Sequence, residues 1–369
     1  MDSPFIYNNI VSGPDFIART SELDMLSTLI KEHKCAVIYE PAKNGKQSFI
    51  QQTFQKIRYE SYKYKVCNIS LFNVRTEELL YQKLEQALLE AFNSDKPFVG
   101  TFESPSELLE LGEKLADEDG CDLVIYIEEF QDILHFSNYY DVLKKFEHAC
   151  LNLIGKNKDS RGKDNEQVPD NQTRRVSMIF SGSFVNAMKD IFEKKKFFYN
   201  MAQRVKLSKI DERSFIEHIV KSFLKAGRVV PKELARHIYT LTEGQPWYTQ
   251  QLADIGFGLT RGYLTEGIIN QAFKLLMEMH SYRFKVLTSR LSLFQLNMLR
   301  AILEGAEKLS AAETMEKYQL QSSANVNRLK EALEKKEIIE FTKYGPVFLD
   351  PLLKTWMNEI YFGITTQND

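Results

Sequence analysis

Apolar runs alternate with segments of helical spacing along the first part of the chain. Five compact runs are predicted strands: residues 35–40, 65–71, 121–130, 176–183 and 203–210. Between them, apolar residues recur at helical intervals over residues 45–59, 76–92 and 104–118. Because the runs are continuously apolar, the pattern predicts an α/β fold whose parallel sheet is covered by helices on both faces.

The pattern becomes helical throughout from residue 211 to about residue 282. Three helical segments and a hairpin are then expected: residues 294–305, 310–320, 322–338 and 338–349. The hairpin is predicted to turn at Tyr344, Gly345 and Pro346. Three helices followed by a hairpin are the layout of a winged helix. We therefore predict three domains: an α/β domain at 1–210, a helical lid domain at 211–285 and a winged-helix domain at 286–369.

Residues 155–175 interrupt the α/β pattern. Val168 is the one large apolar residue in this polar and charged segment. Such a segment cannot bury apolar surface, so we expect a flexible surface insertion. Its basic side chains alternate with acids, which favours a solvated loop over a binding arm.

The charge balance argues against a general affinity for polyanions. The 369 residues include 48 basic and 50 acidic side chains, for a formal net charge of −2. Any nucleic-acid contact would therefore need a local basic patch. We find neither a signal peptide nor an apolar run that could cross a bilayer, and we expect no membrane partner. Four widely spaced cysteines without a CxxC pair indicate reduced thiols and a cytoplasmic protein.

A candidate phosphate-binding loop lies between the strand at 35–40 and the helix that follows it. Its G-K pair, Gly45 and Lys46, sits where a G-x-x-x-x-G-K-[ST] loop requires it. The glycine lets the backbone approach an anion, and the lysine neutralises phosphate charge. The residues expected to bind nucleotide are Pro41, Ala42, Lys43, Asn44, Gly45, Lys46, Gln47 and Ser48. A plain junction between strand and helix is the alternative.

Two positions of this loop depart from the pattern. Glu40 stands in place of the first glycine, where its charge would oppose phosphate unless the side chain points away. Gln47 replaces the Ser or Thr whose hydroxyl normally ligates Mg²⁺. Gln47 could offer an amide oxygen, and Ser48 is adjacent, but neither is equivalent to the usual ligand.

A second candidate element is the apolar strand that ends in Glu128 and Glu129. In P-loop ATPases the first acid at such a strand end holds Mg²⁺, and the second polarises the attacking water. The predicted Mg²⁺ ligands are thus Ser48, Gln47 and Glu128, and Glu129 is the predicted catalytic residue. The alternative is an ordinary strand end with solvated acids. The preceding G-K loop favours the functional interpretation.

Further motifs occur in order along almost the whole chain. Residues 16–23 read F-I-A-R-T-S-E-L, residues 127–131 read I-E-E-F-Q, and residues 350–356 begin with D-P and end with W. Together with the loop at 40–48, they resemble the AAA-like P-loop ATPases of archaea and bacteria, relatives of the STAND and Orc/Cdc6-type proteins. The resemblance implies an ATP/ADP site with Mg²⁺ between the α/β domain and the lid.

The resemblance also implies roles for single residues. Arg19 and Ser183 would lie at the nucleotide, with Ser183 sensing the γ-phosphate. Pro246 begins a lid helix near the base, although a proline at the first helical position needs no ligand. Arg204 would act near the nucleotide or a neighbouring subunit; a surface arginine introducing a strand is the alternative.

The predicted recognition helix of the winged helix starts near Ser322. Val326, Leu329 and Leu333 form its core-facing stripe. Outward basic residues alternate with glutamates, which favours a protein partner or an intramolecular role over DNA.

Two functions fit the sequence. One is an ATP-binding switch or weak ATP hydrolase whose lid and winged helix respond to nucleotide. The other is a pseudo-ATPase scaffold or DNA-binding regulator that has lost hydrolysis, since the departures fall on the metal and phosphate positions.

Overall fold

The computed structural model describes residues 3–155 and 175–364. Their contacts form two compact units, and each is described by itself. The α/β unit comprises the described residues of 19–42 and 46–208, and the helical unit those of 1–18, 43–45 and 209–369. The predicted insertion at 155–175 lies, from 156 to 174, outside the described residues. None of the helices described is long and apolar enough to span a bilayer.

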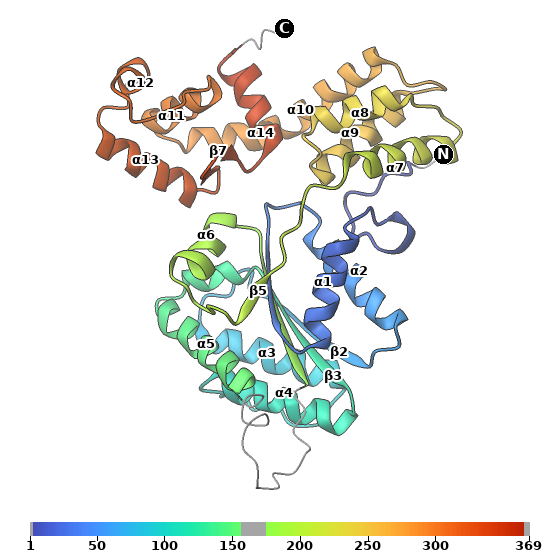
Figure 1. Cartoon of the computed structure of the whole chain (residues 1–369), viewed down its shortest axis with the longest axis vertical. Coiled ribbons are helices and arrows are strands. Elements are labelled where there is room, and N and C mark those ends of the chain that lie inside the picture. Colours follow the sequence, from blue (N-terminus) through green and yellow to red (C-terminus); the bar gives the residue numbers. More distant parts are fainter. Residues whose placement is uncertain (1–2, 156–174, 365–369) are drawn as a thin grey trace. The chain divides into compact units, whose positions relative to one another are not determined.

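The α/β unit is built on a five-stranded parallel sheet with the order β2-β3-β4-β1-β5, which confirms the predicted sheet (Figure 1). Its strands are β1 (Cys35–Tyr39), β2 (Tyr64–Ser70), β3 (Asp122–Glu128), β4 (Val176–Gly182) and β5 (Ala202–Arg204). Every residue of β1 and β4 is buried, as expected for strands covered on both faces. The continuous apolar runs in the sequence follow from this double burial.

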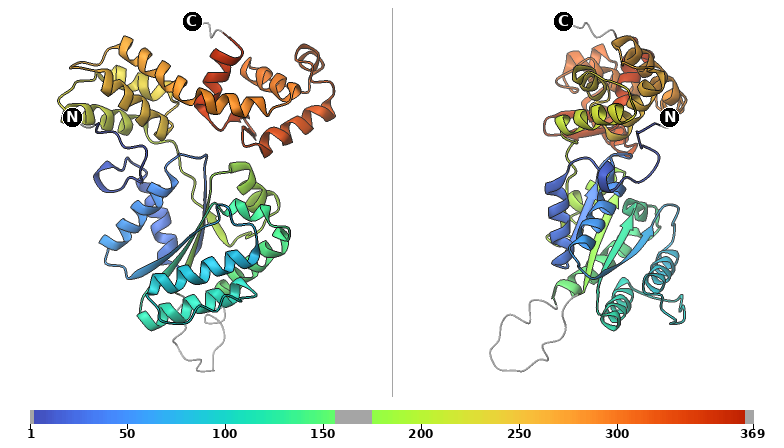
Figure 2. Two further views of the ribbon diagram at one scale, coloured as in Figure 1. Left: turned by 180° about the vertical axis from the view of Figure 1, so that it is seen from behind. Right: turned by 90° about the vertical axis from the view of Figure 1, so that its right-hand side faces the viewer.

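Helices cover both faces of the sheet (Figure 2, right). The helices α1 (Thr20–Lys31) and α2 (Lys46–Tyr59) lie on one face. The other face carries α3 (Glu77–Phe92), α4 (Pro105–Asp119) and α5 (Tyr139–Gly155). The short helix α6 (Val185–Lys189) follows β4.

The last predicted strand, 203–210, is much shorter in the structure. β5 ends at Arg204, and Val205 N donates the following hydrogen bond to Val37 O. Further on, Leu207 N donates to the Glu40 carboxylate at 3.1 Å. The neighbouring strand β1 has already ended, so a side chain takes the place of a backbone acceptor.

The helical unit contains the lid and the winged helix. Its elements are α7 (Glu212–Lys225), α8 (Lys232–Leu241), α9 (Pro246–Leu259), α10 (Glu266–Ser289), α11 (Leu293–Leu303), α12 (Ala312–Lys317), α13 (Ser323–Lys335), β6 (Ile339–Thr342), β7 (Gly345–Phe348) and α14 (Pro351–Trp356). One apolar core runs through all of it, from Phe5 and the lid helices to Trp356. Helix α10 is continuous through the predicted boundary at 285, and the division into lid and winged-helix domains stays a prediction.

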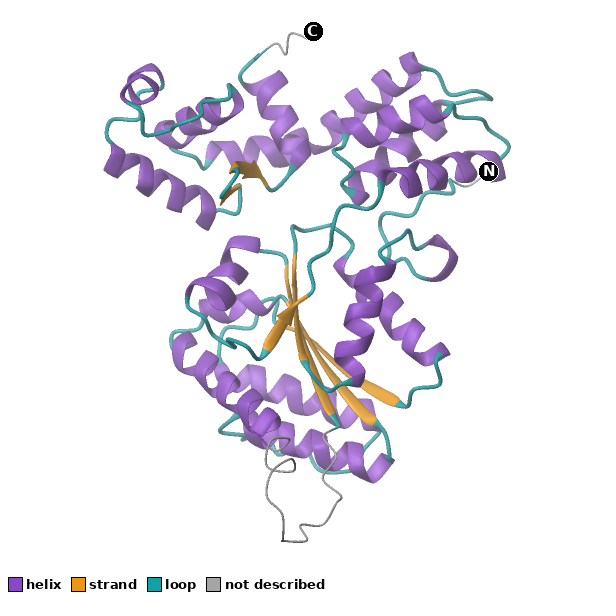
Figure 3. Cartoon of the chain, viewed as in Figure 1, coloured by secondary structure: helices purple, strands orange, loops and turns teal. Residues whose placement is uncertain are grey.

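The winged-helix part has the expected helices and hairpin (Figure 3). Val326, Leu329 and Leu333 are buried, which confirms the predicted core stripe. The hairpin turns at residues 343–344, which is one residue before the predicted start at Tyr344. Thr342 pairs with Gly345, so Gly345 already belongs to β7. The Thr342 hydroxyl accepts from Tyr344 N and donates to Gly345 O, which closes the turn before Pro346.

Asp350 joins the lid to the winged helix within this unit. Its carboxylate caps α14 by accepting from Leu352 N and Leu353 N at 3.0 and 3.1 Å. The same group accepts from the Tyr248 hydroxyl of α9 at 2.9 Å and forms an ion pair with Arg283 of α10 at 3.0 Å. The D-P motif is therefore a structural link between three helices.

Replacing Asp350 with alanine should destabilise the protein by about 2–4 kcal/mol, because a helix cap and a hydrogen bond to a charged group are lost together. Thermal and urea unfolding measure the loss. Asp211→Ala is the matched control. Asp211 caps α7 through Ser214 N, and within the described residues its carboxylate accepts no hydrogen bond from another helix. An equal loss in both variants would contradict the linking role of Asp350.

Candidate functional site

The loop between β1 and α2 has the backbone of an anion-binding turn. Lys43 and Gly45 have positive φ angles of 66° and 79°. α2 begins at Lys46, and its first turn contains no acidic residue. The amide groups at the start of a helix lack partners inside the helix and carry partial positive charge. The 14-residue helix α2 thus presents a favourable end to an anion.

Two buried cations lie beside this loop. Arg19 and Lys46 are only 6% and 7% exposed. The Lys46 ammonium donates to the carbonyl oxygens of Glu40 and Pro41 at 2.8 and 3.1 Å. Burial lowers the pKa of Lys46 to about 8, although Glu129 and Glu40 oppose the shift; Arg19 adds to it. The two cations therefore repel each other inside the protein.

Arg19 is held by an unusual backbone. Ala18 and Arg19 both have left-handed φ angles, 57° and 66°. Glycine adopts this conformation without strain, so Ala18 stands at a position that favours glycine. Arg19 immediately precedes α1, and burial lowers the pKa of its guanidinium while Glu22 and Glu40 favour the charge.

The Glu40 side chain is directed to the segment after β5. Its carboxylate accepts from Leu207 N and lies 3.8 Å from the Arg204 guanidinium. Burial raises the pKa of Glu40, and Arg204 acts in the opposite direction. The acid that replaces the first glycine is thus used to hold the segment after β5.

The Arg204 side chain, on the edge strand β5, is held by partners within the α/β unit. Its guanidinium stacks on the Tyr39 ring at 3.7 Å and donates to Glu193 at 3.0 Å. Tyr39 donates its hydroxyl to the same Glu193 carboxylate. These contacts suit the alternative of a structural arginine, and a role for Arg204 in catalysis stays a prediction.

The register of the sheet brings Glu129 and Ser183 together. Tyr39 of β1 pairs with Gly182 of β4, and Ile127 of β3 pairs with Phe180. Parallel strands have their carboxyl ends at the same edge, so the residues after β3 and β4 meet there.

The Glu129 carboxylate is held by three donors. It accepts from Ser183 Oγ at 2.7 Å, from Ser183 N at 3.2 Å and from Gln131 Nε2 at 2.7 Å. A Cβ at Gly182 would lie 2.4 Å from Met188 Cγ and 2.5 Å from Gln131 Oε1, so a larger residue would displace both side chains. The predicted catalytic acid and the predicted γ-phosphate sensor are therefore in direct contact.

Glu128, at the end of β3, faces two amides. Gln47 Nε2 donates to one of its oxygens at 2.7 Å, and Asn68 Nδ2 donates to the other at 3.0 Å. The structure thus brings the predicted metal residues Gln47 and Glu128 together. The amide of Gln47 presents N–H to the carboxylate, which is the wrong polarity for a shared cation. This donor set does not fit Mg²⁺.

Other features give no second site. Among residues 3–155 and 175–364, no three His, Cys, Asp or Glu side chains are placed to hold a metal ion. Pro246 begins α9 in the helical unit, where the Gln245 side chain accepts from Tyr248 N as a helix cap. Its predicted place near a base stays a prediction.

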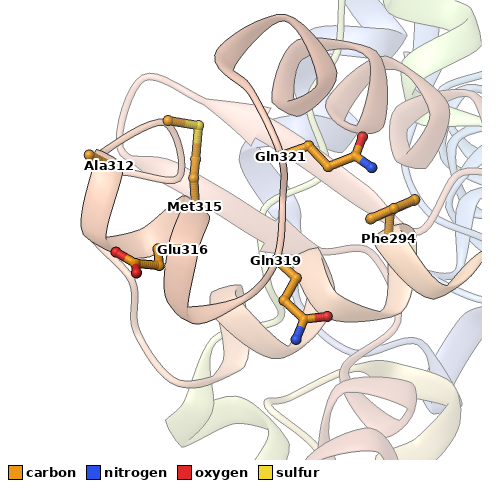
Figure 4. Close-up of a pocket in the computed structure, with 6 residues that line it drawn as sticks. All are labelled: Phe294, Ala312, Met315, Glu316, Gln319 and Gln321. Carbon is orange, nitrogen blue, oxygen red and sulfur yellow. The ribbon is translucent and has the colours of Figure 1, made fainter.

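A hollow of 580 Å³ lies in the winged helix (Figure 4). Its lining residues come from α11, α12 and the segment after α12: Phe294, Ala312, Met315, Glu316, Gln319 and Gln321. None of these residues was predicted to bind nucleotide.

Sequence reasoning missed the partners that hold the acids. Asn68 and Gln131 bind Glu128 and Glu129, and Glu193 binds Arg204. Asn68 is a polar residue inside an apolar strand, which is a usable signal. Glu193 gives none, because only the fold brings it to β1.

The comparisons with known proteins agree with the fold. Residues 282–359 match the model of a family described as a probable winged helix domain. No curated protein matches the sequence at a significant level. Among solved structures, the Walker-type ATPase paby2304 of Pyrococcus abyssi has a TM-score of 0.69 and 17% identity, covering 95% of this chain and 99% of its own.

Two Aeropyrum pernix proteins are also similar. The ORC2 protein, solved as ADPNP–ADP complexes, has a TM-score of 0.64 and 15% identity, covering 95% of this chain and 93% of its own. The ORC1 protein, solved in complex with DNA, has a TM-score of 0.50 and 12% identity over 95% and 94%. At such identities the likeness is one of fold. The chain therefore has the fold of the AAA-like P-loop ATPases of the Orc/Cdc6 type, with a C-terminal winged helix domain.

Proposed function

We propose that the chain binds ATP or ADP at the loop 41–48 and acts as a nucleotide-dependent switch. The observation that carries the proposal is the pair of buried cations, Arg19 and Lys46, beside the start of α2. Buried like charges are unfavourable, and a polyanion beside them would remove that cost. The turned-away Glu40 leaves phosphate unopposed by the one acid that the loop contains.

The switch would act through the two hydrogen bonds that Ser183 donates to Glu129. Ser183 is bound to Glu129, and a γ-phosphate at the loop would compete for the same donors. Because lid and winged helix share one core, a movement of the lid would carry the winged helix with it. A slow ATPase would suit such a switch better than rapid turnover.

For the winged helix we propose a protein partner. Arg328 and Lys335 on α13 and Lys336 directly after it are exposed, but Glu331 is exposed among them and dilutes their charge. DNA is the second candidate, as winged helices place a recognition helix in a groove. The four described cysteines are buried free thiols, in keeping with the proposed cytoplasmic location.

Replacing Lys46 with alanine should weaken ATP binding by about 30- to 100-fold, since a charged contact to phosphate is lost. Isothermal titration calorimetry measures the affinity. Lys34→Ala removes an exposed lysine that pairs with Glu32, and it should bind ATP as the native protein does. Equal affinities of native protein and Lys46→Ala, or no binding by native protein at millimolar ATP, would refute the site.

Affinity should fall as pH rises above 8. In the free protein the pKa of Lys46 is about 8, and bound phosphate would raise it. Above pH 8 binding must therefore take up a proton, and each pH unit should weaken it by up to about tenfold until the pKa of the complex is reached. Titrations from about pH 7 to about pH 9.5 test this, with Lys46→Arg as control because its charge persists. A flat native profile would show that Lys46 does not meet the phosphates.

A pseudo-ATPase scaffold or regulator is the second candidate, and the Glu129 contacts favour it. Both oxygens of Glu129 accept hydrogen bonds from Ser183 or Gln131, which leaves fewer lone pairs for polarising a water.

We expect phosphate release below about 1 s⁻¹, the low end of ordinary turnover. If Glu129 positions water, Glu129→Gln should lower the rate further while ATP still binds. Identical rates in native protein, Glu129→Gln and buffer, with ATP bound, would favour the pseudo-ATPase. Turnover well above this limit would contradict the slow switch.

A further inference from the structure

An amide bridge occupies the place where P-loop proteins of this kind hold their metal ion. We use this name for Gln47, Glu128 and Asn68, in which both carboxylate oxygens accept an amide N–H, at 2.7 and 3.0 Å. Gln47 lies in the first turn of α2, directly after Lys46. Glu128 and Asn68 come from the neighbouring strands β3 and β2. Three elements of the α/β unit thus meet at this carboxylate.

In this orientation neither amide can ligate a cation shared with Glu128. Amide N–H groups are donors and cannot ligate a metal ion. Turning the Gln47 amide would place its oxygen against the Glu128 carboxylate, where two negative atoms repel. Without a metal, the arrangement with N–H facing the carboxylate is therefore the stable one. It gives each oxygen of Glu128 a hydrogen-bond donor.

Ser48 cannot replace the missing hydroxyl at this point. Successive residues of an α-helix differ by about 100° in direction, so positions 47 and 48 do not face the same ion. Gln47 donates to Glu128, and Ser48 follows it at about 100° around α2. Mg²⁺ demands near-octahedral oxygen ligands and gives up its water reluctantly, so a single carboxylate already engaged by two amides is a poor site.

We propose that this chain takes nucleotide in its metal-free form, with the amide bridge in place of Mg²⁺. The proposal rests on the proposed nucleotide site. The charge that Mg²⁺ would neutralise is met instead by the two buried cations, Arg19 and Lys46. Mg²⁺ in solution then competes with the protein for ATP, so it weakens apparent binding. This is the reverse of the behaviour of a metal-dependent loop.

The test measures ATP and ADP binding by calorimetry in excess EDTA and in excess MgCl₂. The native protein should bind at least as tightly in EDTA as in MgCl₂. Gln47→Thr restores a hydroxyl and opens the bridge; it should reverse the order and bind about tenfold more tightly with Mg²⁺. Gln86→Thr is the matched control, because Gln86 donates a similar bond to Glu90 on the surface of α3. This control should keep the native order.

Each outcome decides a different point. Native binding that is about tenfold tighter in MgCl₂ than in EDTA would overturn the metal-free site while leaving the nucleotide site intact. No native binding in either solution would overturn both proposals. The native comparison needs no variant, so it holds even if Gln47→Thr is unstable.

Discussion

The parallel pairing of β1, β3 and β4 is the constraint on which the candidate site depends. Tyr39 lies opposite Gly182, and Ile127 opposite Phe180, so three strand ends reach one edge of the sheet. A shift of one residue in either pair would turn Glu128 or Ser183 to the other face. The same register lets Ser183 donate twice to Glu129.

Electrostatics at this edge combine buried cations with engaged acids. Lys46 and Arg19 are buried close enough to influence each other, whereas Glu40, Glu128 and Glu129 each accept hydrogen bonds from protein donors. Protein donors thus stabilise the charge of the acids, while burial and the nearby Arg19 disfavour the charge of Lys46. The proposed nucleotide site would use this difference to hold an anion without a metal ion.

Within the helical unit, Asp350 connects helices that lie far apart in the sequence. It caps α14, accepts a hydrogen bond from Tyr248 and forms an ion pair with Arg283. Because α10 is continuous between lid and winged helix, these parts do not have separate cores. The proposed switch would use this shared core to pass a movement of the lid to the winged helix.

The sequence by itself determined the fold class, the G-K loop, the acidic strand end and the winged helix. These features are local: apolar periodicity and short motifs act within one element or between neighbouring ones, and they can be read without knowing the fold. It also predicted the core stripe of Val326, Leu329 and Leu333. The predictions of a longer last strand and of the position of the hairpin turn were wrong. In both places a side chain, that of Glu40 or Thr342, accepts a hydrogen bond from a backbone N–H.

Tertiary structure alone decided what the charged residues do. Glu40 looked like a hindrance to phosphate and is used to hold Leu207, and Arg204 is held by Tyr39 and Glu193. Gln47 looked like a weak metal ligand and instead donates to Glu128. These partners lie more than ten residues apart in sequence, and their direction is set by sheet order and register. The identity of a side chain determines which bonds it can form, but the fold determines which atoms lie within its reach.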